Sequence, residues 1–310
     1  KKTINTFNHN ILSSFFFYSM PLRTSPFQLG LIGYPLGHSL SPKIHSAALQ
    51  ACKLEGAYSL FPIHPDDEQA LKDLLSRVRS GEIQGLNVTI PHKQNVMQFL
   101  DELTPTARSI GAVNTIYLRE NKLIGDNTDA PGFLADLKHT FKVSSFRLPS
   151  SALVLGSGGS ARAIVYALLN NGWEITLVAR RIEQARQLAL LFPEYEIRTI
   201  NYESLILQPS SFSLPSSFCL LVNTTPVGMT PNIDQSPWPE NLAFPPHAAI
   251  YDLVYNPRET KLVRDACAQG RLATTGLGML VAQAALSFEI WTGCKPPREV
   301  MFEALDQPAH

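Results

Sequence analysis

The stretch ALVLGSGGSA, residues 152–161, decides the fold of the second half of this 310-residue chain. Ala152–Leu155 is short and apolar, which is typical of a buried strand, and the glycines after it let the backbone turn tightly. A helix of small residues is expected from there to Asn170. Glu174–Ala179 then forms the next strand and completes a βαβ unit of about 30 residues. This order predicts a Rossmann-type unit with a phosphate site at the helix N-terminus.

The end of the second strand indicates which dinucleotide is bound. Units that bind NAD commonly carry an acid there, which holds the ribose 2′-hydroxyl. Here Arg180 and Arg181 follow the strand, and the first acid is Glu183. Arginine suits a 2′-phosphate, so NADP is the expected cofactor, although two solvated arginines after a strand are the alternative. The expected contacts with the cofactor are Gly156, Ser157, Gly158, Gly159, Ser160, Ala161, Arg180 and Arg181.

Strand and helix patterns alternate along the first half of the chain, and the second half continues in the same way. Such alternation predicts an α/β fold with a largely parallel, helix-covered sheet in each half. Expected strands are 28–33, 58–63, 85–90, 113–118, 219–223 and 249–253, expected helices 42–51, 66–80, 94–100, 279–291 and 298–305, and expected surface loops 208–217 and 231–246.

Composition excludes several classes of function. Lys and Arg together number 26, as do Asp and Glu, so nothing suggests a nucleic-acid or anionic membrane partner. The histidines show no ligand spacing, which predicts that no metal is bound. The apolar run at residues 11–20 is too short for a membrane span and is interpreted as part of a disordered extension. A targeting segment is the alternative, since Lys1 and Lys2 precede a run of signal-peptide length, but no A-x-A cleavage site follows it. We expect the four cysteines to be reduced thiols in a cytoplasmic protein, because Cys52, Cys219, Cys267 and Cys294 form no C-x-x-C pair.

Three polar stretches of the first half predict a chemical site: HSLSP (38–42), NVTIPHK (87–93) and GDNTD (125–129). Lys93 follows the end of a strand, the edge where open α/β sheets place a ligand crevice. A lysine there can donate a proton, and Asp129 can hold it ionised and aimed. Asp126 is the competing carboxylate, and these residues alone leave the choice open.

With these stretches the chain resembles the shikimate dehydrogenase family from about Leu29 to Leu305. Three further motifs follow in family order: GAVNT (111–115), NTTPVGM (223–229) and GLGMLVAQA (276–284). The resemblance implies an NADP-dependent, reversible reduction of 3-dehydroshikimate to shikimate, in the pathway to chorismate and the aromatic amino acids. Two alternatives are a quinate/shikimate dehydrogenase with relaxed cofactor use, and a non-catalytic relative that senses NADP or shikimate.

The resemblance also implies a role for individual residues. Lys93 and Asp129 match the catalytic pair at the substrate's 3- and 4-oxygens, and the motif register favours Asp129 over Asp126. The substrate carboxylate would be bound by Ser39, Ser41 and Tyr255. The ring hydroxyls of the substrate would be bound by Thr89, Asn114 and Gln283. The nicotinamide end of the cofactor would contact Asn223, Thr224, Gly276 and Met279. Simpler roles remain open: the serines could cap a helix, Thr89 and Asn114 could be turn residues, and Met279 could belong to the core.

Because Gln283 belongs to the substrate motif, the C-terminal helices are expected to fold back on the first unit. The expected domains are a disordered extension (1–25), a substrate-binding domain (26–129 plus 276–310) and an NADP-binding domain (130–275). The expected partner is a small-molecule substrate, and the protein would be a monomer or homodimer.

Overall fold

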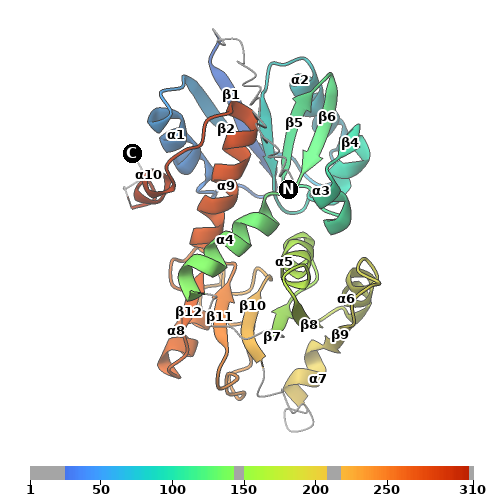
Figure 1. The fold of residues 1–310 in the computed structure, drawn as a ribbon, viewed down its shortest axis with the longest axis vertical. Coiled ribbons are helices and arrows are strands. Elements are labelled where there is room, and N and C mark those ends of the chain that lie inside the picture. The colour runs from blue at the N-terminus through green and yellow to red at the C-terminus, as the bar shows by residue number, and fades with distance from the viewer. Residues whose placement is uncertain (1–24, 143–149, 208–217, 307–310) are drawn as a thin grey trace, which may run out of the picture.

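The strands form two separate sheets in the computed structural model, which describes residues 25–142, 150–207 and 218–306. Within these ranges each sheet has six strands. Figure 1 shows the two halves stacked along the long axis, with two helices, α4 (Asp129–Phe141) and α9 (Leu277–Thr292), lying across the junction. The predicted α/β class with two sheet units is confirmed. The expected N-terminal extension lies outside the described residues up to residue 24.

The first sheet has the strand order β2-β1-β3-β5-β6-β4. β1 pairs in parallel with β2 and β3, but β5 pairs antiparallel with both β3 and β6. This half is therefore more mixed than the alternating pattern predicted. Its elements are β1 (Phe27–Gly33), α1 (Ser41–Ala51), β2 (Gly56–Pro62), α2 (Glu68–Arg79), β3 (Gly85–Val88), the 3₁₀ helix η1 (Asn95–Phe99), β4 (Glu102–Leu103), α3 (Pro105–Ile110), β5 (Thr115–Arg119) and β6 (Lys122–Asp126).

The hairpin between β5 and β6 explains the mixed pairing, and it was not predicted from the sequence. Only Glu120 and Asn121 separate the two strands, and their φ values are 49° and 59°. Two consecutive left-handed residues form the tight turn that suits the twist of a hairpin. The usual marker is Asn-Gly or Asp-Gly, and its absence here hid the turn.

The second sheet is parallel throughout, in the order β12-β11-β10-β7-β8-β9. Successive residues of β7 enter different cores: Ala152 and Val154 pack in one cluster, and Leu153 and Leu155 pack in another. A strand buried on both faces needs such a continuous apolar run. The elements are β7 (Ser150–Leu155), α5 (Gly159–Leu169), β8 (Trp173–Ala179), α6 (Ile182–Ala189), β9 (Ile197–Asn201), α7 (Tyr202–Leu207), β10 (Phe218–Asn223), β11 (Ala249–Asp252), α8 (Lys261–Ala268) and β12 (Ala273–Thr275).

Helix α9 belongs to both halves. Met279 near its start packs in the core of the second sheet, and Val281 and Phe288 pack in the core of the first. Helix α10 (Arg298–Glu303) also joins the first core, through Met301. The predicted return of the C-terminal helices to the first unit is thus confirmed.

Two predictions need correction. Cys52 and Cys294 form a disulfide with 6.5 Å between their Cα atoms, whereas reduced thiols were expected. They lie 242 residues apart, so no local spacing could reveal the pair; packing of α1 against α9 brings them together. The loop 231–246 is also more than a surface loop, because Trp238 and Phe244 are buried and stacked in a core. The other expected loop, 208–217, lies outside the described residues.

Candidate active site

A buried ion pair stands at the junction of the two halves. The Lys93 Nζ atom lies 2.6 Å from Asp129 Oδ2, and the two side chains are only 14% and 6% exposed. Lys93 lies in the turn after β3, and Asp129 is the first residue of α4. Charges this far from water are costly unless they are paired. The two side chains therefore offset each other's burial where the two halves meet.

The competing carboxylate has different partners. Asp126 Oδ1 accepts hydrogen bonds of 2.7 Å from the Thr104 hydroxyl and of 2.7 Å from the Asn127 backbone N–H. Thr104 is the N-cap of α3, so Asp126 helps to fix that helix start. The geometry pairs Lys93 with Asp129 rather than with Asp126.

Asn114 connects the ion pair with the substrate residues expected on α9. Its Nδ2 atom donates to Asp129 Oδ1 at 2.9 Å and to Gln283 Oε1 at 3.3 Å. Its Oδ1 atom accepts from the Thr128 backbone N–H at 2.7 Å. Asn114 is thus a member of the site network and not simply a turn residue.

A group of buried polar side chains backs this network and was not predicted from the sequence. The hydroxyls of Thr115, Thr128 and Ser287 lie within 2.7–3.2 Å of one another. Asn87 adds an amide that donates to Ser287 Oγ at 3.0 Å. The polar NVT and NTD stretches hinted at it, but Ser287 on an otherwise apolar helix gave no signal.

The two serines expected at the substrate carboxylate lie together at the start of α1. Neither serine caps α1 through its side chain; instead Ser39 Oγ accepts from the Ser41 backbone N–H at 3.3 Å. Ser41 is buried at the start of α1, and the Tyr58 hydroxyl donates to Asn87 Oδ1 at 2.8 Å. Burial raises the pKa of Tyr255, so its hydroxyl stays a neutral donor. Thr89 follows β3 directly, and its backbone N–H donates to Ile32 at 2.8 Å.

The glycine loop is shaped to receive a phosphate and touches the lysine. Gly156 has φ of 109°, and a Cβ atom there would lie 2.5 Å from the Thr224 hydroxyl. Gly158, the N-cap of α5, has open space where a side chain would be, and no side chain caps that helix start. A Cβ on Gly159 would lie 3.2 Å from Lys93 Cβ. Open N–H groups at a helix N-terminus fit a pyrophosphate, so the residues present fit a dinucleotide.

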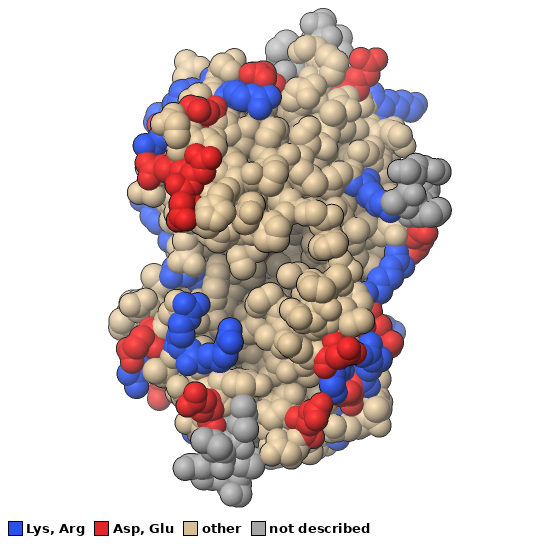
Figure 2. All heavy atoms as spheres, turned by 180° about the vertical axis from the view of Figure 1, so that it is seen from behind, with Lys and Arg blue, Asp and Glu red and all other residues tan. Residues whose placement is uncertain are grey.

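Arg180 and Arg181 are both exposed directly after β8. Figure 2 shows the face behind α4 and α9, which is hollowed across its middle. Lys or Arg side chains gather at the lower left rim of the hollow. Because Figure 2 is turned by 180°, this rim is on the side where Figure 1 shows β8 and α6 at the right. The exposure of Arg180 and Arg181 leaves both guanidinium groups available to a bound anion.

The other expected cofactor residues are mostly buried. Asn223 is fully buried and faces Asp252, Gly276 packs on the Leu253 backbone, and Met279 is 7% exposed in the core of the second sheet. Only Thr224 of this group lies against the glycine loop. Contact of the others with a cofactor stays a prediction. His92, to which no catalytic role was assigned, is buried and bonds the Ile63 carbonyl at 2.7 Å.

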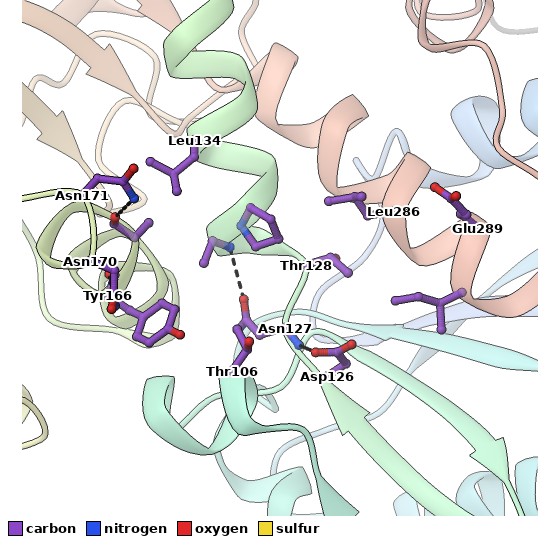
Figure 3. A pocket seen from close by; sticks show the side chains of 14 residues that line it. Thr106, Asp126, Asn127, Thr128, Leu134, Tyr166, Asn170, Asn171, Leu286 and Glu289 are labelled. Atoms are coloured by element: carbon purple, nitrogen blue, oxygen red, sulfur yellow. Dashed lines mark hydrogen bonds between the residues drawn. The ribbon is translucent and has the colours of Figure 1, made fainter. Parts of the chain in front are cut away.

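A cavity of about 480 Å³ lies behind the site, between α4, α5 and α9. Figure 3 shows Leu134, Tyr166 and Leu286 along its walls and Asn127 and Thr128 at its floor. Lys93 and Asp129 do not line it. Asn127 Oδ1 accepts from the Asp129 backbone N–H at 3.1 Å. Asn127, at the floor of the cavity, therefore stabilises the first turn of α4.

No helix in the described ranges is long and apolar enough to cross a bilayer, and no group of three or more His, Cys, Asp or Glu residues there could hold a metal ion. The parallel sheet with its glycine loop, set against a buried Lys–Asp pair, defines a nucleotide-dependent dehydrogenase of two α/β units. Comparison with known proteins shows to which family of dehydrogenases the chain belongs.

The shikimate dehydrogenase substrate binding domain matches residues 31–116, and the shikimate 5′-dehydrogenase C-terminal domain matches residues 276–305. The chain is 41% identical to a Salinibacter ruber shikimate dehydrogenase (NADP(+)), over 92% of this chain and 99% of that protein. A Synechocystis enzyme of the same name is 42% identical over 89% and 94%. A Thermus thermophilus shikimate 5-dehydrogenase, solved with NADP(H) and shikimate, has a TM-score of 0.77 at 38% identity, covering 90% of this chain and 98% of its own. The chain belongs to the shikimate dehydrogenase family.

Proposed function

We infer that this protein is an NADP-dependent shikimate dehydrogenase, which reversibly reduces 3-dehydroshikimate to shikimate in the pathway to chorismate and the aromatic amino acids. The buried pair of Lys93 and Asp129, beside Gly159 of the phosphate loop, is the observation that carries this function. The contact supports a proton donor on the cofactor-facing side of the substrate unit. A spectrophotometric assay of shikimate and of quinate, each with NADP and with NAD, tests it. Fast turnover of shikimate with NADP is expected, and faster turnover of quinate would overturn the substrate assignment.

Lys93 and Asp129 are proposed to act as one unit. NADPH, when bound, supplies the hydride, and negative charge develops on the substrate's carbonyl oxygen. The Lys93 ammonium donates a proton to that oxygen or stabilises its charge. Asp129 holds the ammonium in place, and Asn114 holds Asp129 through its second oxygen. In the reverse direction the same pair receives the proton from the hydroxyl.

The rest of the substrate is proposed to be held by hydroxyl and amide groups. Thr89, Asn114 and Gln283 would bind the ring hydroxyls, and Ser39, Ser41 and Tyr255 the carboxylate. The hydrogen bond from the Ser41 N–H to Ser39 Oγ at the start of α1 supports one common site for the two serines. Neutral hydroxyl donors can bind the substrate carboxylate without competing with Lys93 for Asp129.

The Ser39→Ala variant should raise KM for shikimate by about 10-fold or more with kcat little changed. The reason is that a hydrogen bond to a charged group contributes about 1.5–3 kcal/mol. Steady-state kinetics at saturating NADP measure both constants. Ser59→Ala, an exposed serine of β2, is the matched control and should leave KM unchanged. An unaltered KM in Ser39→Ala would argue against carboxylate binding by Ser39.

The glycine loop of Gly156, Ser157, Gly158, Gly159, Ser160 and Ala161 is proposed to bind the pyrophosphate, and Arg180 and Arg181 the 2′-phosphate. Asn223, Thr224, Gly276 and Met279 would shape the nicotinamide end. Two observations support this: α5 begins without a side-chain cap, and both arginines are exposed directly after β8, the strand that pairs with β7.

The Arg180→Ala variant should weaken NADP binding and leave NAD binding nearly unchanged, because only NADP carries the 2′-phosphate. The loss of one charge-assisted contact predicts a roughly 10–150-fold rise in KM for NADP. Arg186→Ala is the matched control, since this exposed arginine on α6 bonds Glu183 instead. Equal losses with NADP and NAD would refute recognition of the 2′-phosphate.

We also propose the domain bounds of residues 26–129 plus 276–310 for the substrate and 130–275 for NADP. The balanced charge of the chain supports a protein without nucleic-acid or membrane-surface partners. We propose a cytoplasmic monomer or homodimer. Disulfides such as Cys52–Cys294 are uncommon in the cytoplasm. Counting the free thiols of this protein in cell extracts therefore tests the proposed location.

A further inference from the structure

Asp252 is a fully buried acid that takes no part in the proposed proton transfer. It ends β11, opposite Asn223 at the end of β10. Its Oδ1 atom accepts from Asn223 Nδ2 at 2.8 Å and from the Val254 backbone N–H at 3.0 Å. Its Oδ2 atom accepts from the Thr260 hydroxyl at 2.6 Å. The backbone ladder between β10 and β11 does not need these three bonds.

The bond to Asn223 fixes the turn that follows β10. A carboxylate only accepts hydrogen bonds, so the amide of Asn223 must turn its Nδ2 atom toward Asp252. Asn223 Oδ1 then faces Thr225 and accepts from its backbone N–H at 2.9 Å and from its hydroxyl at 2.7 Å. Asp252 thereby sets the conformation of residues 223–225 without touching their outer surface.

This turn lies against the phosphate loop. The Thr224 backbone N–H and hydroxyl both donate to the Leu155 carbonyl, at 2.9 Å and 2.7 Å. Gly156 has no room for a side chain because the Thr224 hydroxyl is there. A shift of the turn would therefore move the surface on which the nicotinamide end is proposed to rest.

The second bond of Asp252 Oδ1 fixes the turn after β11, which leads to Tyr255. The Val254 N–H donates to Asp252, and the Val254 carbonyl accepts from the Gly276 N–H at 3.4 Å. Gly276 packs so tightly on Leu253 that a Cβ atom would lie 2.4 Å from the Leu253 carbonyl oxygen. Asp252 Oδ1 thus holds both the turn at residues 223–225, on the proposed cofactor side, and the turn at residues 253–255, which leads to the proposed substrate residue Tyr255.

Burying this acid is costly. Burial raises the pKa of Asp252 to about 6, although the bonds from Thr260, Asn223 and Val254 oppose the rise. Buried charges are retained in proteins when their bonds specify a structure. We propose that Asp252 is a positioning residue that keeps turns 223–225 and 253–255 in register, so that cofactor and substrate meet in reactive alignment. This role rests on the proposed function.

Asp252→Ala should lower kcat by about 10-fold or more and raise KM for shikimate, because a misplacement of about 1 Å can cost about 10²-fold. With NADPH deuterated at the transferred position, the primary isotope effect on kcat for 3-dehydroshikimate reduction should increase, since a slowed hydride transfer then contributes more to limiting turnover. Asp252→Asn should restore most of the turnover: its Oδ1 can accept from Asn223 and Val254 while its Nδ2 donates to Thr260.

Thr260→Val is the matched control. It removes the bond to Oδ2 and the cap of α8 but leaves both turns bonded to Oδ1. Its Tm should fall while kcat, KM and the isotope effect stay near those of the unmodified enzyme. An equal kinetic loss in Thr260→Val would overturn the positioning role, because general destabilisation would then explain both variants.

Asn223→Leu keeps the test decisive if Asp252→Ala does not fold. This substitution removes the hydrogen bond between residue 223 and Asp252 while Asp252 stays in place. The same loss of kcat and the same larger isotope effect are therefore expected. Normal values in Asn223→Leu would overturn the proposal. If the unmodified enzyme does not turn over shikimate with NADP, the proposed function fails and this role falls with it. If it does so and the variants behave normally, the positioning role alone fails.

Discussion

Lys93→Ala should lower kcat for shikimate oxidation by about 10²–10⁴-fold, with a much smaller change in KM. Positioned acid–base groups typically contribute that much to a rate. Lys93 is 14% exposed and its ammonium is held by Asp129 at 2.6 Å, so neither water nor another lysine can easily take its place. Stopped-flow measurement of NADPH formation at saturating substrates gives the rate of the chemical step directly.

The matched control is Lys122→Ala. Lys122 also pairs with a carboxylate, that of Glu102, but both side chains are about half exposed and lie on the outer strands β6 and β4. Such surface pairs contribute little, so turnover should stay normal. A Lys93→Ala enzyme within a few-fold of normal turnover would refute the proposed proton transfer.

Asp129→Asn should lower kcat by about 10²-fold, the lower end of the same range. The asparagine keeps the size of the side chain, but the neighbouring ammonium loses its counter-charge in a site with little water. The amide must also turn an N–H₂ group toward either Lys93 or Asn114, both of which donate to Asp129. Steady-state kinetics and a thermal melt separate lost chemistry from lost stability.

Asp126→Asn is the control for this variant, because the two acids are three residues apart and only one touches Lys93. Asp126 accepts from Thr104 and Asn127. Its replacement should therefore cost about 1 kcal/mol of stability and leave kcat near normal. The opposite result, with Asp126→Asn inactive and Asp129→Asn active, would reverse the assignment made from the geometry.

Local patterns predicted the βαβ unit of the second half well but missed β9, β12 and the helices α6, α7 and α8. Ala152–Leu155, the glycines and Glu174–Ala179 carry strong short-range signals, and the structure places β7, α5 and β8 there. The first half was predicted less well because its central hairpin turns at Glu120 and Asn121, which are poor turn markers. The turn forms because β5 and β6 are paired along five residues each.

The candidate site was only partly visible in the sequence. Lys93, Asp129 and the glycine loop were found because charged residues and glycines that directly follow apolar strands are typical of ligand sites in α/β sheets. Ser287 and Asp252 were missed, since each looks ordinary within its own segment. Their importance comes from partners far along the chain: Ser287 bonds Thr115 across 172 residues, and Asp252 bonds Asn223 across 29.

By itself the sequence determined the class of fold and predicted a cofactor site and the residue types of the chemistry, because these depend on short-range periodicity and on motifs a few residues long. The motif register favoured Asp129 over Asp126, but only the tertiary structure showed its contact with Lys93 and decided that α9 completes both cores and that Cys52 meets Cys294. Those outcomes depend on which side chains meet when helices and sheets pack, and packing joins residues whose separation along the chain carries no signal.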